Sequence, residues 1–372
     1  MKSAYIFILS LLAFGIFSCS PDRHISADLS AGDTITAESS LLTLVDMGDW
    51  TAAEVRVPWS DSLPLARYAI VHPDKEVSEL SEGFIVIESP VNKSVVLSSV
   101  YTHAIAELGH LDAVRGVADG SYYPVNDTVA ALISSNKICD IGSSMSPLIE
   151  NVVDLEPDVI LLSPYAGNNS TGLEKLNVPM VWMADYLEDS PLGRAEWILF
   201  IGELLGEREQ AMRFYQNARQ NYTEISRLTD EIEIKPTVIV EKPMSGVWYV
   251  PGGQSYIAKM IEDAGGKYPW DHNRDKGSIS LDAAAVVDKG ADADIWLIKD
   301  IKDITLESLL REVPQARALK PFDEKVYLCN TLSSPYYNVI AFRPDSVLAD
   351  MAALFHPEIF PNHNFTFYKK IK

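Results

Sequence analysis

Two segments far apart in the sequence each place a carboxylate at the predicted start of an apolar helix. Ser146-Pro-Leu-Ile-Glu150 leads through an apolar stretch into the strand 159–162, and Ser278-Ile-Ser-Leu-Asp282 leads in the same way into the strand 295–298. An acid at the positive end of a helix stabilises it by about 0.3–1 kcal/mol, which is one reason for this pattern. The other is recognition, because two matched acids can pair with two arginines on a two-fold symmetric partner. Glu150 and Asp282 are therefore candidate docking residues.

The histidines of the chain do not show the spacing of a metal site. His103 and His110 lie seven residues apart, but Gly109 is predicted to end the helix that would place them on one face. A directly bound ion needs three or four converging His, Asp or Glu ligands. We therefore predict no metal ligands and no cofactor, and we expect any metal to arrive inside an organic ligand.

A catalytic alternative comes from Ser134-Ser-Asn-Lys137, which fits S-x-x-K, and from Lys276-Gly-Ser278, which resembles the later basic triplet of serine acyltransferases. The nucleophile of that class begins a buried helix, whereas Ser134 lies in a polar stretch, and no separate S-x-N element turns up in a plausible loop. An acyltransferase-like enzyme using Ser134 and Lys137 is the alternative from a different class. A structure with both side chains exposed would exclude it.

The first residues predict export and lipid anchoring. Lys2 and the apolar run from Tyr5 to Phe17 form a signal peptide over residues 1–18, because the run is shorter than the roughly 20 residues of a spanning helix. A small residue before Cys19 is typical of a bacterial lipoprotein signal, so Cys19 is the predicted lipidation site. Residues 19–40, rich in Ser, Thr, Ala and Asp, predict a flexible tether to the membrane. The formal net charge of −21 argues against a nucleic-acid partner.

The remaining sequence alternates predicted strands and helices, which indicates an α/β fold with mostly parallel sheets. The prediction is two Rossmann-like lobes joined by a long rigid interdomain helix, with a small N-terminal β layer. Residues 41–190 form the N-terminal lobe including this layer, and residues 235–372 form the C-terminal lobe. The helix covers residues 191–230, with Pro191 at its first position and Gly206 as an interruption.

The order of several short motifs resembles one known family. The segments are Ser98 to Gly109, Val114 to Val117, Leu155 to Leu161, Trp248 to Ser255, Ala264 to Gly266 and Ser278 to Asp282. Together they resemble the periplasmic binding proteins that serve iron-siderophore, haem and cobalamin importers, over roughly residues 90–372. The resemblance implies a non-enzymatic protein that holds a metal chelate between two lobes and docks on the permease dimer of an ABC importer through Glu150 and Asp282.

The resemblance also implies which residues line the ligand cleft. These are Tyr101, His103, Tyr122, Tyr123, Ser144, Tyr249, Tyr336 and Arg343. Their aromatic rings suit a flat macrocycle or a catecholate chelate, and the cations Arg343 and Lys276 suit an anionic one. Relatives that bind cobalamin have a tryptophan near the position of Ser143-Ser144, so an iron complex, siderophore or haem, is favoured and cobalamin is the alternative. The location implied is exported and lipid-anchored, facing the periplasm or the cell surface.

Overall fold

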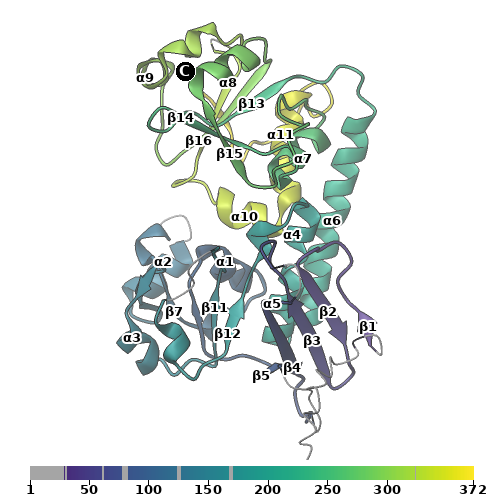
Figure 1. Cartoon of the computed structure of the whole chain (residues 1–372), viewed down its shortest axis with the longest axis vertical. Helices are drawn as coiled ribbons and strands as arrows, with labels where there is room; N and C mark the ends of the chain where they lie inside the picture. The colour runs from purple at the N-terminus through teal and green to yellow at the C-terminus, as the bar shows by residue number, and fades with distance from the viewer. Residues whose placement is uncertain are drawn as a thin grey trace, which may run out of the picture.

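The computed structural model describes residues 29, 32–60, 63–77, 83–123, 127–166, 171–322 and 324–372. They form two α/β lobes stacked end to end, with a β layer beside the N-terminal lobe (Figure 1). The predicted fold class is confirmed. Cys19 and the predicted signal peptide lie outside the described residues. Among the helices that the structure describes, none combines the length and apolarity needed to cross a bilayer.

The N-terminal lobe is built on a five-stranded parallel sheet of order β12-β11-β6-β7-β8. Its strands are short, and the central strands β6 and β11 are fully buried, as expected for a sheet covered on both faces. They are β6 (Ser94–Val96), β7 (Val114–Val117), β8 (Cys139–Asp140), β11 (Val159–Leu162) and β12 (Met180–Trp182). The helices are α1 (Ser99–Glu107), α2 (Asp127–Ser134) and α3 (Ile149–Asp154), and β9 (Gly142–Ser143) pairs with β10 (Ser146–Pro147). Short 3-10 helices are η2 (Leu111–Ala113), η3 (Gly120–Tyr122), η4 (Leu173–Lys175) and η5 (Asp185–Leu187).

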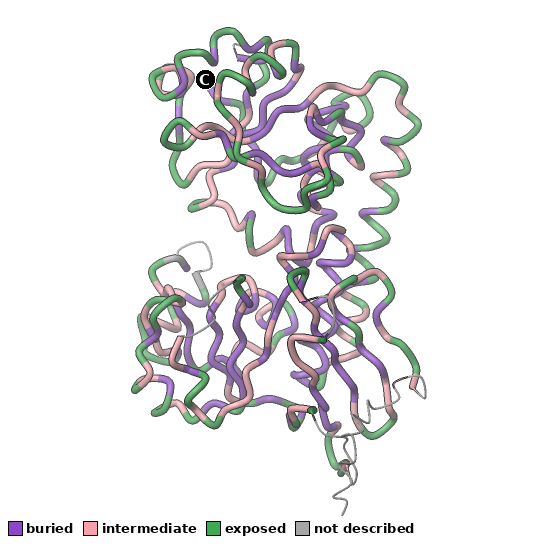
Figure 2. Tube along the Cα trace, in the orientation of Figure 1, coloured by how far each residue is buried: buried purple, intermediate pink, exposed green. Residues whose placement is uncertain are grey.

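The C-terminal lobe has a second sheet, of order β13-β16-β17-β18, whose first three strands are parallel. The strands are β13 (Val238–Val240), β16 (Ile295–Asp300), β17 (Val326–Asn330) and β18 (Lys369–Lys370), and β14 (Val247–Pro251) pairs with β15 (Ser278–Asp282). The helices are α7 (Tyr256–Asp263), α8 (Ala283–Gly290), α9 (Leu306–Glu312), η6 (Pro314–Ala318), α10 (Tyr336–Phe342) and α11 (Pro344–Phe355). Figure 2 shows the buried strands inside both lobes.

The N-terminal β layer is a five-stranded sheet in sequence order, antiparallel except for its last pair. Its strands are β1 (Asp33–Thr34), β2 (Leu42–Asp46), β3 (Trp50–Val55), β4 (Ala66–Val71) and β5 (Ile85–Glu88). One face packs on the helix that follows the N-terminal lobe, with the rings of Tyr68 and Phe200 5.6 Å apart. The layer therefore shares the hydrophobic core of the N-terminal lobe.

The connection between the lobes is three helices rather than one. They are α4 (Pro191–Ala195), α5 (Ile198–Leu205) and α6 (Arg208–Asp230). The expected break at Gly206 is present, with a φ of 72° that glycine adopts without strain, and a second break falls at Glu196-Trp197. The first half of α6 packs Tyr215 into the N-terminal core and its second half packs Tyr222 into the C-terminal core. The single rigid helix expected over 191–230 is therefore wrong in extent, and α6 alone makes the long span.

The predicted tether over residues 19–40 is also wrong for its final part. Ala37, Glu38 and Ser39 donate their backbone N–H groups to the buried carboxylate of Glu196, each at 2.8 Å. The neighbouring Glu188 carboxylate accepts the backbone N–H of Leu41 at 3.1 Å. These two acids fasten the start of the folded chain to the α4 connection, an interaction between residues about 150 positions apart that no local pattern predicts.

Replacing Glu196 by alanine is expected to lower the free energy of unfolding by about 1–3 kcal/mol, because three backbone donors lose their acceptor. Segment 32–41 should then become a site of proteolytic cleavage. Urea unfolding and limited proteolysis measure both effects. Glu209→Ala, which removes an exposed acid on α6, is the matched control and should change neither.

Candidate functional site

A cavity of about 1020 Å³ lies between the two lobes, at the carboxyl ends of the C-terminal parallel strands. In α/β sheets this edge is the usual place for a ligand. The N-terminal side contributes Pro58, Trp59, Tyr186 and Leu187. The C-terminal lobe contributes Glu241, Lys242, Pro243, Met244, Tyr249, Pro251, Ser255, Tyr256, Ile257, Lys276, Gly277, Ser278, Lys299, Asp300, Ile301, Thr331, Tyr336 and Tyr337. We refer to this space as the inter-lobe cavity.

Each lysine of the inter-lobe cavity is paired with a carboxylate. Lys299 contacts Glu241, and its ammonium lies 5.6 Å from the centre of the Tyr336 ring. Burial acts to lower the pKa of Lys299, but the adjacent Glu241 outweighs it and raises that pKa, so the lysine stays charged. Lys242 lies 3.1 Å from Asp300. These pairs hold the charged groups in fixed positions at the strand ends.

The rim is apolar and exposed, although the interior is partly charged. Met244 is 67% exposed, Tyr249 is 45% exposed and Trp59 is 44% exposed. Six aromatic residues line the space, which suits a ligand with flat or conjugated parts. They are Trp59, Tyr186, Tyr249, Tyr256, Tyr336 and Tyr337.

A chain of buried contacts crosses from one lobe to the other behind the cavity. The Arg194 guanidinium on α4 lies 3.0 Å from Asp185 and 5.0 Å from the centre of the Tyr256 ring on α7. Burial acts to lower the pKa of Arg194, but Tyr256 and Asp185 outweigh this effect and raise that pKa. The guanidinium therefore stays cationic. Tyr101 donates its hydroxyl to Asp185 at 2.9 Å. These contacts position Tyr256 of the cavity wall directly, and they hold Asp185, the residue before Tyr186 of that wall.

Of the predicted cleft residues, Tyr249 and Tyr336 lie in the inter-lobe cavity, as does Lys276. The predictions for Tyr101 and Tyr123 are wrong, because both side chains are buried in the N-terminal core. Burial raises the pKa of both tyrosines, and the Tyr123 hydroxyl lies 3.0 Å from that of Thr102.

The other predicted cleft residues lie outside the cavity lining. Arg343 pairs with Asp345 at 2.8 Å and packs on the Phe214 ring of α6, so it supports the joint between the lobes. His103 lies 3.6 Å from Glu107 on α1, and burial lowers its pKa although Glu107 opposes that shift. Ser144 donates its backbone N–H to Asp119. The Tyr122 side chain is outside the described part of the chain.

The sequence reasoning missed Trp59, Tyr186, Tyr256 and the Glu241–Lys299 pair. Glu241 and Lys299 stand at the ends of β13 and β16, and Tyr186 follows β12. Their position at carboxyl strand ends was a usable signal. Trp59 carried no such signal, because it comes from the loop between β3 and β4 of a separate sheet.

The candidate docking acids lie on different lobes, and both are exposed. Glu150 lies in the first turn of α3. Asp282 caps α8, accepting the backbone N–H of Ala284 at 2.8 Å. Neither acid lines the inter-lobe cavity. The structure thus leaves both carboxylates available to a partner.

The catalytic and direct-metal alternatives fail on geometry. Ser134 and Lys137 are both exposed, and the serine hydroxyl donates to the Ala130 carbonyl of its own helix, so the acyltransferase arrangement is excluded. His110 pairs with Glu207 at 3.0 Å, away from His103. No group of three or more His, Cys, Asp or Glu side chains is placed to hold a metal ion within the described ranges.

Two α/β lobes joined by helices, with a cavity at the strand ends between them, define a two-lobed solute-binding protein. A model of the periplasmic binding protein family matches residues 95–320, and the chain belongs to that family. The family resemblance read from the sequence is therefore confirmed, and the protein is a substrate-binding protein of ABC transport rather than an enzyme.

The chain is also similar to curated relatives and to solved structures. Two uncharacterised lipoproteins of Methanocaldococcus jannaschii are each 27% identical, over 80% and 82% of this chain and 73% and 80% of their own lengths. A Helicobacter pylori CeuE structure with a nickel–histidine complex has a TM-score of 0.59 at 18% identity, covering 75% of this chain and 87% of that one. A periplasmic haem-binding protein of Pseudomonas aeruginosa has a TM-score of 0.55 at 16% identity, covering 76% and 96%. These two structures share the fold.

Proposed function

We propose that this protein is the substrate-binding lipoprotein of an ABC importer that captures an iron complex, a siderophore or haem, and delivers it to the permease. The observation that carries the proposal is the inter-lobe cavity, which is large and is lined by aromatic residues and lysines. Its volume of about 1020 Å³ is at the upper end of the roughly 300–1,000 Å³ of small-molecule sites, which fits a bulky chelate.

The lysines of the inter-lobe cavity are the groups that could bind an anionic ligand. The chain as a whole carries −21, yet the lining has three lysines against two carboxylates. Asp189 and Glu312, just outside the lining, pair with Lys276 and Lys242 and offset this excess, so the lysines are local cationic groups and not a net positive site. Ferric chelates and haem carry carboxylate or phenolate oxygens that lysine ammonium groups can bind.

The absence of a ligand cluster among the described side chains supports capture of the metal inside its chelate. The aromatic rim offers faces for stacking on a porphyrin or on catecholate rings. Cobalamin is the second candidate, since the large cavity volume suits its size.

Anchoring and docking complete the proposal. Lipidation at Cys19 would hold the protein on the outer face of a membrane, in keeping with the lipoprotein names of the Methanocaldococcus relatives. Glu150 on one lobe and Asp282 on the other would contact one permease subunit each, because both are exposed and lie outside the cavity.

The direct test is titration of the purified full-length protein with haemin, several ferric siderophores and cobalamin, followed by tryptophan and tyrosine fluorescence. We expect saturable, sub-micromolar binding of one iron complex and weaker binding of its metal-free form, because the cavity recognises the assembled chelate. Tight binding of cobalamin alone would select the second candidate. Binding of none of these compounds would contradict a chelate ligand.

A further inference from the structure

The N-terminal β layer supplies part of the wall of the inter-lobe cavity. Of the four lining residues on the N-terminal side, Pro58 and Trp59 come from the loop between β3 and β4, and only Tyr186 and Leu187 come from the α/β part of the lobe. Half of the lining residues on that side therefore come from a loop of the N-terminal β layer.

Backbone hydrogen bonds position the described residues around Trp59. Val57, two residues earlier, is buried in the N-terminal core. The Ser60 N–H donates to the Val57 carbonyl at 3.1 Å, and the Leu65 N–H donates to the Val55 carbonyl at 2.7 Å, closing the base of the loop. The side chain of Trp59 is 44% exposed where it lines the cavity.

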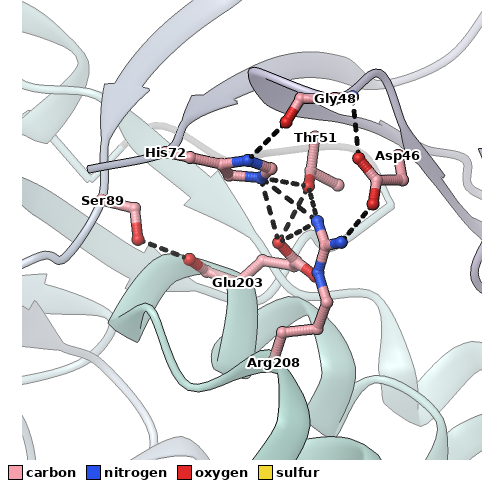
Figure 3. Close-up of polar contacts among 7 residues, drawn as sticks. All are labelled: Asp46, Gly48, Thr51, His72, Ser89, Glu203 and Arg208. Atoms are coloured by element: carbon pink, nitrogen blue, oxygen red, sulfur yellow. Dashed lines mark hydrogen bonds and ion pairs between the residues drawn. The ribbon is translucent and has the colours of Figure 1, made fainter. Parts of the chain in front are cut away.

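The whole sheet is in turn locked to the helices of the N-terminal lobe by buried polar contacts (Figure 3). Thr51 of β3 donates to the buried Glu203 of α5 at 2.8 Å, and the Arg208 guanidinium of α6 contacts both residues. Ser89, just after β5, donates to the Glu203 carbonyl at 2.8 Å. Trp59 therefore comes from the N-terminal half of the molecule, whereas Met244 and Tyr249 line the cavity from the C-terminal lobe.

Five large side chains that line the cavity are exposed, which indicates a surface that a ligand covers: Trp59, Met244, Tyr249, Ile301 and Tyr337. An indole, a thioether and a phenol at the same rim leave apolar area in water, and such grouped exposure marks binding sites. Trp59, Met244 and Tyr249 come from both halves of the molecule, so a ligand in the cavity can contact all three only when it bridges the lobes.

We propose that Trp59 is a ligand-contacting residue, which stacks on a flat conjugated part of the chelate and makes the N-terminal β layer a determinant of ligand choice. This inference rests on the proposed function. Stacking on an aromatic face is expected for porphyrin or catecholate rings and gives little to a hydroxamate, which lacks such rings. The β layer would thus favour aromatic chelates among the iron complexes.

The test compares variants of the purified full-length protein against haemin, a ferric catecholate and a ferric hydroxamate. Trp59→Ala should raise the Kd for the bound aromatic chelate by tenfold or more, and Trp59→Phe should stay within about threefold of the wild type, because a smaller ring retains part of the stacking. The control is Trp50→Phe, which changes a tryptophan of the same sheet that packs on Phe84 outside the cavity. It should leave the Kd unchanged and should lose less of the ligand-induced quenching than Trp59→Phe.

The outcomes separate the inference from the function it rests on. Tight chelate binding by the wild type with an unchanged Kd in Trp59→Ala would overturn the role of Trp59 and leave the proposed function standing. Normal binding with lost uptake in Trp59→Ala would assign the residue to the permease surface, and so also overturn the inference. No binding of any chelate by the wild type would overturn both together.

Discussion

Cells producing the double variant Glu150→Gln/Asp282→Asn should lose ligand uptake, while the purified variant binds the ligand as tightly as the wild type. Both acids are exposed and lie outside the inter-lobe cavity. Removing one partner of a charge pair buried in an interface costs roughly 2–5 kcal/mol, so losing one on each lobe should prevent productive docking.

The choice of amides keeps the fold constant. Asp282 caps α8, and asparagine is about as good a cap as aspartate, so Asp282→Asn removes the charge while retaining the contact with Ala284. Asp282→Ala would also remove the cap and lower stability by about 1 kcal/mol. Uptake of labelled ligand and titration of the purified variant are the two measurements. If the variant binds the ligand more weakly but the uptake per bound ligand is unchanged, these acids take part in ligand recognition. That result would contradict the docking role.

Replacing Asp185 by alanine is expected to cost about 3–5 kcal/mol of stability, because it leaves the Arg194 guanidinium charged and unpaired inside the protein. Asp185 is 1% exposed and Arg194 is 6% exposed. The same change removes the acceptor of the Tyr101 hydroxyl at 2.9 Å. Ligand affinity should fall as well, since Arg194 packs on Tyr256 of the cavity wall.

Asp189→Ala is the matched control for this prediction. Asp189 pairs with Lys276 at 2.5 Å, but both side chains are substantially exposed, and surface pairs contribute about 0–1 kcal/mol. Urea unfolding monitored by circular dichroism compares the two variants. Equal stability losses in Asp185→Ala and Asp189→Ala would contradict a structural role for the buried pair between the lobes.

Local patterns were sufficient for the α/β architecture and the family. Strand β11 is a run of buried valine, isoleucine and leucine, and the Ser190 cap before Pro191 starts α4 where the sequence indicates. Gly206 ends α5 for the same local reason, a left-handed conformation. The periodicity did not resolve the second break at Glu196-Trp197, because the residues around it are apolar enough to continue a helix.

Contacts between residues far apart in the sequence were not predicted. Composition predicted a tether to residue 40, yet Glu188 and Glu196, about 150 residues later, bind residues 37–41 through buried carboxylates. The composition of a polar segment predicts flexibility, because it does not show which acceptors its backbone N–H groups will find. Here those acceptors belong to a distant part of the chain.

In the inter-lobe cavity, too, some features follow from the sequence and others only from the tertiary structure. The sequence by itself determined that tyrosines and lysines stand near strand ends, and Tyr249, Tyr336 and Lys276 do reach the inter-lobe cavity. Only the tertiary structure decided that Tyr101 and Tyr123 turn into the core and that Trp59 joins the cavity from a separate sheet. The physical reason is that a residue's type and spacing fix the element it occupies, whereas the packing of whole elements fixes whether its side chain meets core or ligand.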